Sequence, residues 1–596
     1  MKFSTLNEAY QSREMVESFG GYNHNLRIAE NEFYDMTNLS PDYLPAISPR
    51  KRRGTYAYAV NAGVHNPNGL IAKDALCYVD GITLYINNYA VTGLTLTNGP
   101  KQLISMGAYL IIMPDKKYVN TKDLTDKGDI EATWKSSGTV TYELCRVDGS
   151  EYEEATASAT EPSNPSHMML WIDTSQNPHV LKQYSETTAM WVSIATTYIK
   201  IKATGIASAF SQYDGVKISG IDPELEQLQD LEGQVSALWD AYHDEDNSGA
   251  GDYIVVIGML DSVSTQTDTL TLERKMPNLD FVIESENRLW GCRYGTALDG
   301  SIVNEIYASK LGDFKNWDVF MGLSSDSYVA SCGTDGPFTG AIAHLGYPLF
   351  FKEDCLHKVY GNFPSNFQIQ TTACKGVQKG AGKSLAIVNE RLYYKSRNGV
   401  CVYDGSLPAE ISSAFGDIHY TGVDSNNTDA LRNGAVAGSN KNRYYISMKS
   451  EVDNTWNLFL YDTATGLWFR EDNTRADDFC SCDGKLYFTD HDTSQIRIAD
   501  EGSVQTEVLS WSAETGVLGM GIPDKEYVSR ILIRMTISTG HTVNFYLEYD
   551  SSGTWESAGQ ITGTTMRSFV LPIRPKRCDH FRLKMTGSGA GNVKIH

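Results

Sequence analysis

The chain has 596 residues and carries 51 Lys and Arg against 73 Asp and Glu, a net charge of −22. This length exceeds one ordinary hydrophobic core, so we expect several domains, or fewer if one of them is a large all-β ring. The acidic balance argues against a surface that grips nucleic acid through its phosphates, but it is compatible with an acidic wall that lets nucleic acid pass.

The cysteines and the apolar runs narrow the class of protein further. The ten cysteines include no C-x-x-C pair, which favours reduced thiols made in a cytoplasm over a disulfide framework. Residues 1–21 lack the apolar run of a signal peptide, and no eighteen consecutive apolar residues occur. We therefore expect a protein without a secretory signal and without stable membrane insertion.

Residues 1–54 are predicted to form an N-terminal extended arm. The proline-rich stretch "NLSPDYLPAISP" leads directly into Arg50, Lys51, Arg52 and Arg53, a basic cluster in an acidic chain. One interpretation is a solvated turn at the entry to the next domain. The other is a contact with an acidic partner or with DNA phosphates.

A recurring unit follows, in which a β-branched or aromatic strand, a polar turn and a second strand close on a corner such as Asp-Gly. From Gly346 onward these units are spaced by roughly 40 to 50 residues, the period of a four-stranded propeller blade. We therefore predict a mainly β fold with a β-propeller of about six blades from residues 55–120 and 276–500, each phrase being the middle hairpin of one blade. A series of sandwiches or barrels with similar hairpins is the alternative. The phrases are "LCYVDGITLYINN", "GAYLIIMPDKKYVN", "ENRLWGCRYG", "GYPLFFKEDCLHKVYG", "NERLYYKSRNGVCVYDG", "NRYYISM" with "WNLFLYDTATGLWFR", and "DGKLYFTDHDTSQIRIAD".

Residues 121–275 break the repeat and are predicted to form an inserted acidic domain of α+β type. They hold 26 acidic and 10 basic residues. Asp222 as N-cap and Pro223 at the first helical position predict one helix, whose apolar stripe we interpret as core and not as an interface. The stripe consists of Leu225, Leu228, Val235, Leu238, Trp239 and Tyr242.

Residues 501–596 change pattern again. The runs "EYVSRILIRMTIS", "HTVNFYLEYD", "SFVLPI" and "HFRLKMTG" alternate polar and apolar residues with a period of two and end in a glycine-rich corner. This pattern predicts a C-terminal antiparallel β-sandwich of jelly-roll type.

Motifs that carry chemistry are sparse. "GVQKGAGKS" from Gly376 imitates a phosphate-binding loop, but five residues separate Gly376 from Gly382 and a strand-like run follows. "DEDNSGAGD" from Asp244 imitates a calcium loop, but Val255 stands where a bidentate Glu is needed. No G-x-S-x-G, H-E-x-x-H or Cys/His ligand cluster occurs. We therefore expect no catalytic residues, no metal site and no cofactor, and we expect that the protein is not an enzyme.

Three stretches carry a resemblance to a known family. The opening "FGGYNHNLRIAENEFYDMTNLSPDYLPAISPRKRRG", the phrase "PNLDFVIESENRLWGCRYG" with "NEIYASKLGDFKNWDVF", and the ending "RPKRCDHFRLKMTGSGAGNVKI" are similar to tail nozzle proteins of short-tailed bacteriophages, also called tail tubular protein B or packaged-DNA stabilisation proteins. The resemblance covers the predicted propeller and both chain ends. The acidic insert lies outside it.

The resemblance implies a structural virion protein, made in the host cytoplasm and located in the tail. It implies a homo-oligomeric ring, a hexamer, that closes the DNA exit channel below the portal and an adaptor or head-completion protein. Tail fibres or tail-tip proteins would be further partners, and packaged DNA would pass through the lumen on ejection. The resemblance assigns no catalytic role to any residue.

Two other functions fit the same residues. A glycan-binding or glycan-degrading tail protein would use aromatic side chains as sugar platforms, although the sialidase-type S-x-D-x-G-x-T-W box is missing. A tail-tip component of a long-tailed phage is the second alternative.

Overall fold

The computed structural model describes residues 15–56, 64–229, 231–239, 252–297, 300–421, 434–500, 509–519, 526–563, 567–589 and 592–596. In these ranges the regular structure is almost entirely strand, and the helical elements are short 3₁₀ turns. The mainly β class predicted from the sequence is therefore confirmed.

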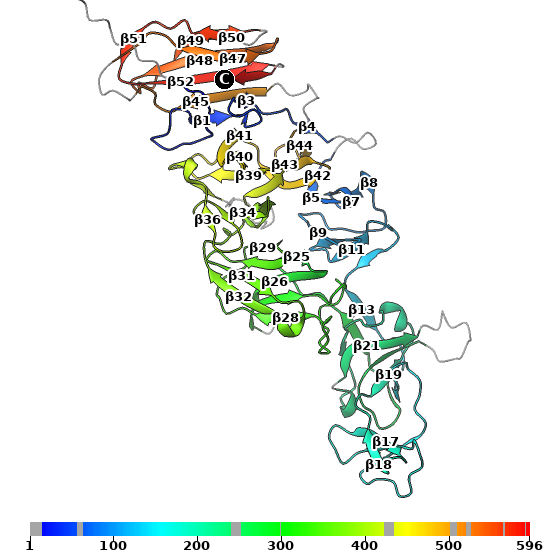
Figure 1. Ribbon diagram of the computed structural model, residues 1–596. Helices are drawn as coiled ribbons and strands as arrows, with labels where there is room; N and C mark the ends of the chain where they lie inside the picture. Colours follow the sequence, from blue (N-terminus) through cyan, green and yellow to red (C-terminus); the bar gives the residue numbers. More distant parts are fainter. Residues whose placement is uncertain are drawn as a thin grey trace, which may run out of the picture. The chain divides into compact units, whose positions relative to one another are not determined.

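Seven small antiparallel sheets recur along the chain outside residues 132–274 and the C-terminal sheets, as counted over the described residues (Figure 1). Six have four strands, and the sheet that contains β37 has five. Their strands are β5 (Pro67–Lys73), β6 (Ala75–Asp80), β7 (Thr83–Ile86), β8 (Tyr89–Ala90); β9 (Gln102–Met106), β10 (Tyr109–Met113), β11 (Lys117–Asn120), β12 (Lys127–Asp129); β25 (Phe281–Ser285), β26 (Arg288–Thr296), β27 (Ile302–Ala308), β28 (Tyr328–Ser331); β29 (Gly340–His344), β30 (Tyr347–Phe351), β31 (Cys355–Tyr360), β32 (Gln368–Ala373); β33 (Ala386–Val388), β34 (Arg391–Lys395), β35 (Val400–Tyr403), β36 (Ala409–Glu410); β37 (Tyr420–Thr421), β38 (Val436–Asn440), β39 (Arg443–Ser450), β40 (Trp456–Asp462), β41 (Leu467–Asp472); and β4 (Gly54–Thr55), β42 (Ala476–Cys482), β43 (Lys485–Asp490), β44 (Gln495–Ile498).

Three of the sequence phrases place a leucine at the same position of their sheets. Leu289, Leu392 and Leu486 are each the second residue of the strand that follows the first hairpin turn, and Tyr445 is the third residue of β39, which follows β38 in the same way. Two-residue turns with positive φ join the first strand to the second in several sheets, the geometry that matches strand twist in a tight hairpin. These turns include Glu286-Asn287, Leu345-Gly346, Asn389-Glu390 and Asp483-Gly484.

The last of the seven sheets is completed by a strand from the N-terminal region. β4 pairs with β44 through Gly54 opposite Ile498 and Thr55 opposite Arg497. Residues 476–498 supply the other three strands, β42, β43 and β44. This sheet therefore combines the beginning and the end of the repeated region.

The chain divides into two compact units. The first contains residues 1–103, 338–358 and 371–596, and the second contains residues 104–337 and 359–370.

In the first unit, neighbouring sheets contact one another through their first strands. β33 contacts β38, β38 contacts β42, and β42 contacts β5. A Cβ placed on Gly438 of β38 would lie 2.4 Å from the Cβ of Phe479 in β42, so this close approach requires glycine. The amide of Lys101, just before β9, donates to the carbonyl of Asn68 in β5 at 2.6 Å. β29 contacts the 3₁₀ turn η5 (Gly382–Ser384), which precedes β33.

In the second unit, the sheets β9–β12 and β25–β28 share one buried cluster. It includes Ile111 of β10 and Leu289 of β26, both fully buried. Trp290 of β26 packs against Phe367, which precedes β32, with ring centroids 5.0 Å apart. Neighbouring sheets in this unit are thus joined by apolar side chains.

Residues 132–274 form three further sheets in the second unit. The strands are β13 (Ala132–Lys135), β24 (Thr271–Arg274), β20 (Lys217–Ser219); β21 (Glu232–Trp239), β22 (Tyr253–Ile257), β19 (Tyr198–Lys202), β14 (Val140–Cys145), β23 (Ser264–Gln266); and β15 (Ala155–Ser158), β16 (Leu170–Asp173), β17 (Val180–Ser185), β18 (Met190–Ser193). The 3₁₀ turn η1 spans Ala207–Ala209. The described part of this region is therefore all-β, and the prediction of an α+β insert is wrong.

The helix predicted from Asp222 does not form. Asp222 accepts a hydrogen bond from the amide of Glu224, as a cap would, but only the 3₁₀ turn η2 (Glu226–Leu228) follows. The next residues form strand β21, which pairs with β22. Leu228 and Val235 are buried as predicted, but long-range sheet pairing overrides the helical spacing. Tyr242 lies outside the described residues.

A buried polar network holds the base of this region to the β27–β28 loop. Arg274, at the end of β24, forms an ion pair with Asp214. The side-chain amide of Asn316 donates to Asp214 at 2.9 Å, and the backbone amide of Gly215 donates to Asn316 at 2.8 Å. Asp214, Arg274 and Asn316 are all buried. Each charge is therefore compensated inside the protein.

The strands after residue 508 form an antiparallel sandwich in the first unit, and the N-terminal segment takes part in it. β1 (Phe33–Thr37) pairs with β45 at the edge of the larger sheet (Figure 1). Both sheets contribute buried residues to one cluster. The larger sheet has the order β1, β45 (Leu509–Thr515), β52 (Phe581–Gly589), β48 (His541–Tyr549), β49 (Glu556–Thr562); the smaller has β50 (Arg567–Val570), β47 (Leu532–Ile537), β53 (Val593–Ile595); and the pairs β46 (Glu526–Val528) with β51 (Lys576–Cys578) and β2 (Leu39–Ser40) with β3 (Ser48–Pro49) complete it.

Candidate functional site

The basic cluster at residues 50–53 lies between β3 and β4, where the chain leaves the sandwich and enters the last of the seven sheets. Its four side chains therefore start from a short segment bounded by two fixed strands. Their partners include residues of β41 and β52, together with Asn38, Thr474 and Asp500.

Arg53 is the centre of the cluster. Its guanidinium lies 2.6 Å from a carboxylate oxygen of Glu471 and 2.7 Å from one of Asp472, the last two residues of β41. It also donates to the hydroxyl of Thr474 at 2.7 Å and lies 5.3 Å from the ring centre of Phe488 in β43. Its side chain is only 9% exposed. Arg53 thus joins β41 to β43 from inside the protein.

The pKa values in this cluster follow from burial and close charges. Burial alone would raise the pKa of Asp472, but Arg53 and Arg50 lower it to about 2. Burial alone would lower the pKa of Arg53, and Asp472 and Glu471 raise it above its ordinary value instead. Both groups are therefore charged across the physiological range.

The other members of the cluster have different environments. Arg50 is buried and donates from Nε to the side chain of Asn38 at 2.7 Å. Arg52 donates to the carbonyl of Gly589 in β52 at 3.0 Å. Lys51 is half exposed and lies 2.9 Å from Asp500, whose hydrogen bond raises the lysine pKa.

The structure separates the two interpretations of this cluster residue by residue. A solvated turn is wrong for Arg50 and Arg53, because both side chains are buried in ion pairs within the chain. Contact with DNA or with an acidic partner stays a prediction, and Lys51 is the member with the most exposed side chain to make it.

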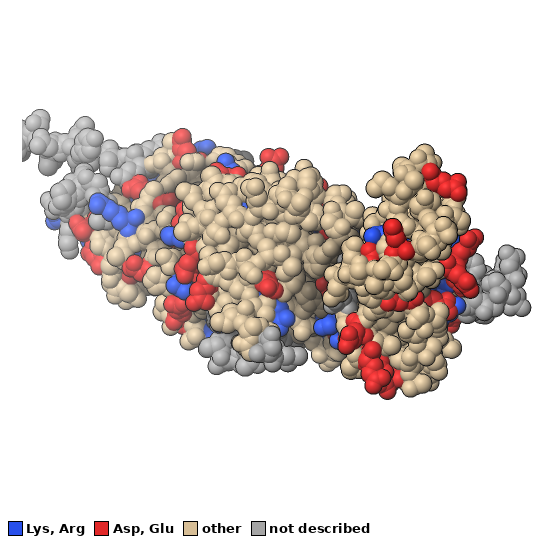
Figure 2. Space-filling view, turned by 90° about the horizontal axis from the view of Figure 1, so that it is seen from below, with Lys and Arg blue, Asp and Glu red and all other residues tan. Residues whose placement is uncertain are grey.

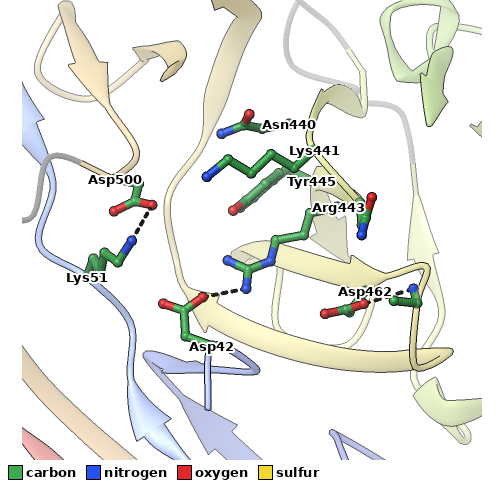
Figure 3. A pocket seen from close by; sticks show the side chains of 10 residues that line it. Asp42, Lys51, Asn440, Lys441, Arg443, Tyr445, Asp462 and Asp500 are labelled. Carbon is green, nitrogen blue, oxygen red and sulfur yellow. Dashed lines mark hydrogen bonds and ion pairs between the residues drawn. The ribbon is translucent and has the colours of Figure 1, made fainter. Parts of the chain in front are cut away.

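A polar pocket of about 190 Å³ opens beside Lys51 (Figure 3). The pair Lys51 and Asp500 forms one side, and Arg443, which is paired with Asp42, faces it. The pocket is lined by Asp42, Lys51, Asn440, Lys441, Asn442, Arg443, Tyr445, Asp462, Ala464 and Asp500. All of these residues belong to the first unit.

This pocket presents charged side chains of both signs to a ligand. Three cationic and three carboxylate side chains balance, and two of the cations are already paired. The amine of Lys441 forms no ion pair within the described residues, so it is free to meet a carboxylate or phosphate group.

Sequence reasoning located Lys51 but missed its partners. Asp500 is 449 residues away along the chain, and the Asp42–Arg443 pair spans 401 residues. No spacing rule connects positions so distant. Lys441 lies in a turn with a φ of 53°, and the asparagines that flank it in "SNKNRYY" are the local sequence signal for that turn.

The segment that imitates a phosphate-binding loop does not form one. Gly382–Ser384 forms the 3₁₀ turn η5, strand β33 follows, and Lys383 lies 3.0 Å from Asp478. The calcium-like loop from Asp244 falls largely on residues 240–251, outside the described residues. Across the described ranges, no group of three or more His, Cys, Asp or Glu side chains could hold a metal ion. No helix in those ranges is long and apolar enough to cross a membrane.

The surface charge is predominantly negative on the face in Figure 2. Acidic side chains are more numerous there than basic ones, and wide areas carry neither. This agrees with the excess of 73 acidic over 51 basic residues in the sequence.

Comparison with known proteins does not assign the chain to a family. No family model matches the chain, and no curated protein matches it. Among solved structures, it is similar to an acylaminoacyl peptidase complex with 10% identity and a TM-score of 0.23, over 56% of this chain and 55% of that one. It thus spans about half the length of that chain. It is also similar to the extracellular domain of a one-component system of B. thetaiotaomicron, with 9% identity and a TM-score of 0.15 over 94% of this chain and 98% of the other. These scores are too low to carry an argument.

Proposed function

We propose that the chain is a tail nozzle subunit of a short-tailed bacteriophage, a structural protein that closes the DNA exit channel, retains packaged DNA and passes it on ejection. In this proposal the seven small sheets are blades of one β-propeller, one more than the sequence spacing predicts. The protein is located in the virion tail and has no catalytic activity.

The observation that carries the proposal is the closure of the last sheet by β4. Propellers commonly join the two ends of the repeated region in one blade, because this pairing keeps the ring from opening. The contacts between successive sheets favour the same arrangement: β42 lies against β5, and the remaining neighbours follow chain order within each unit. The role in the phage tail is proposed from the resemblance of the chain ends, and of the phrase around Trp290, to nozzle proteins.

The charge of the chain is compatible with this role. A channel that releases DNA quickly must hold few phosphates, because each phosphate that is neutralised adds a salt-dependent binding term. A ring of six copies would carry well over a hundred negative charges, since each chain contributes −22. Such a ring repels DNA along its bore and needs wide contacts or an adaptor to offset its self-repulsion.

Electron microscopy of virions and of the purified protein tests the proposal. We expect six-fold rings from the purified protein at raised salt, and we expect an antibody against the chain to label virions at the tail, below the head. Virions that are complete and infectious when the gene is deleted would contradict the proposal. Hydrolysis of envelope glycans by the purified protein, lost on a single Asp or Glu substitution, would favour the glycan-processing alternative.

A further inference from the structure

The C-terminal sandwich differs in charge from the rest of the chain. Residues 501–596 contain nine acidic and ten basic residues, whereas the whole chain carries −22. In its smaller sheet, β50, β47 and β53 contain no Asp or Glu. Ile533, Met535 and Ile537 of β47 are buried, so the alternate residues of this strand lie on the outer face of the sheet.

The outer face combines exposed aliphatic side chains with arginines. Leu532 and Val570 are opposite each other and are 46% and 51% exposed. Arg534 is opposite Ser568, and both are exposed. Arg530 precedes β47 and Arg574 follows β50, again exposed. We call Arg530, Leu532, Arg534, Val570 and Arg574 the Arg534 face.

The arginines of this face make no ion pair within the described residues. Arg582 of the same sandwich, in contrast, pairs with Glu514 and with Glu548. Arginine can hold a carboxylate through two parallel hydrogen bonds. Protein interfaces are enriched in arginine and depleted of Asp and Glu, and exposed apolar side chains add area that association can bury. The Arg534 face therefore has the composition of a docking surface for a carboxylate-bearing protein.

A second copy of the chain offers such a surface. Residues 121–275 hold 26 acidic and 10 basic residues. Glu153, Glu154, Glu161 and Glu186 are exposed there and form no ion pair in the described part of the chain. One chain thus carries two different, complementary surfaces. Head-to-tail association into a closed ring requires two such surfaces on each subunit.

We propose that the Arg534 face binds the acidic surface of residues 121–275 on a second copy of the chain. The proposal deepens the ring of the proposed function, on which it rests, by assigning one face to the contact between copies. An unrelated acidic protein and nucleic acid are the other occupants that the experiment distinguishes.

Sedimentation velocity of the full chain over a salt series tests this assignment. R534E/R574E is compared with K379E/K485E, which makes the same charge change at two exposed lysines of the first unit. At low salt we expect R534E/R574E to associate about tenfold more weakly than the control. The difference should shrink as salt screens charges beyond about 10 Å at 0.1 M. L532S/V570S should also weaken association, with a difference that salt changes little.

A charge swap identifies the surface on the second copy. Chains carrying R534E/R574E should regain association when they are mixed with chains carrying E161R/E186R. The proposal is overturned if R534E/R574E associates as strongly as K379E/K485E. It is also overturned if the mixture of R534E/R574E and E161R/E186R chains does not associate more strongly than R534E/R574E alone. Retention of poly-L-glutamate or of duplex DNA by the wild-type chain, lost in R534E/R574E while self-association is unchanged, would assign the face to another acidic protein or to nucleic acid.

The outcomes also separate this proposal from the proposed function. Intact six-fold rings from R534E/R574E would overturn the assigned face and leave the nozzle proposal standing. Absence of wild-type rings under every salt condition, together with virions that do not need the protein, would overturn both. Unchanged near-ultraviolet circular dichroism shows that each variant is folded.

Discussion

The arginines of the N-terminal cluster and those of the Arg534 face have the same chemistry in opposite settings. Arg50 and Arg53 are buried against Glu471 and Asp472, whereas Arg534 is exposed and forms no ion pair within the described residues. The first pair holds one chain together, because a buried charge that loses its partner is costly. The exposed group costs little to leave in water and is available to another surface. The environment of a charge, more than its sign, therefore separates structural from interacting residues.

Replacing Arg53 should have the largest effect. R53M leaves the buried carboxylates of Glu471 and Asp472 with one cation fewer, which typically costs about 3–5 kcal/mol. We expect the segment that contains β1 and β4 to open more often, with amide exchange faster by roughly two to three orders of magnitude. Hydrogen exchange read by mass spectrometry on peptides from residues 33–55 measures this.

A neutralised variant serves as the control for Arg53. R53M/E471Q/D472N removes the charges together and should recover much of the lost protection, because a buried ion pair can often be replaced by uncharged groups at little cost. Equal exchange in R53M and the wild-type chain would show that the cluster does not hold the N-terminal segment.

Acid should weaken the same contact. The folded pKa of Asp472 is about 2 and its ordinary value is 3.8, so its stabilising contribution is fully present above pH 4 and is lost as pH falls from about 4 towards 2. The shift corresponds to about 2 kcal/mol. Protection of residues 33–55, corrected for intrinsic exchange, should fall in this window. In D472N this part of the pH dependence should disappear, and an unchanged profile would contradict the assignment.

Lys51 should contribute much less than Arg53. Its side chain is half exposed and pairs with Asp500 at 2.9 Å, and exposed pairs contribute about 0–1 kcal/mol. K51S should therefore change the protection of residues 33–55 less than tenfold. A loss as large as that in R53M would show that Lys51 stabilises the fold as a buried cation does, despite its exposure.

Removing Arg534 should have the smallest effect on folding. R534S removes an exposed side chain, so the free energy of unfolding should stay within about 0.5 kcal/mol of the wild-type value. Urea denaturation of the two chains side by side measures the difference. A decrease of several kcal/mol in the free energy of unfolding would mean that Arg534 stabilises the sandwich of its own chain and is not available to bind a second copy.

Local sequence patterns predicted the hairpins, but they did not predict which distant strands pair. The phrase around Leu392 contains the turn at Asn389-Glu390, which joins β33 to β34, so local sequence is sufficient to predict the first and second strands of that sheet. The pairing of β4 with β44 depends on residues more than four hundred positions apart. In the insert, the spacing of Leu228 and Val235 suits a helix, but β21 obtains its hydrogen bonds from β22.

The candidate site shows the same division. The run of Arg50 to Arg53 was visible in the sequence because four cations interrupt an acidic chain. Its role depends on Glu471 and Asp472, which stand at the end of an ordinary strand with no distinguishing motif. The Arg534 face went unnoticed because alternating strands predict which residues point outward, but not which cations find a partner in the folded chain.

The pairing of β4 with β44 also constrains how the chain folds during synthesis. Thr55 emerges from the ribosome 442 residues before Arg497, its partner. At about 5–20 residues per second, β4 waits roughly 20 to 90 seconds before its sheet can form. β1 waits longer still for β45. A truncated chain therefore leaves its first strands with unpaired edges, which are prone to pair with other chains. β1 and β4 can therefore pair only after most of the residues between them and their partner strands have been made.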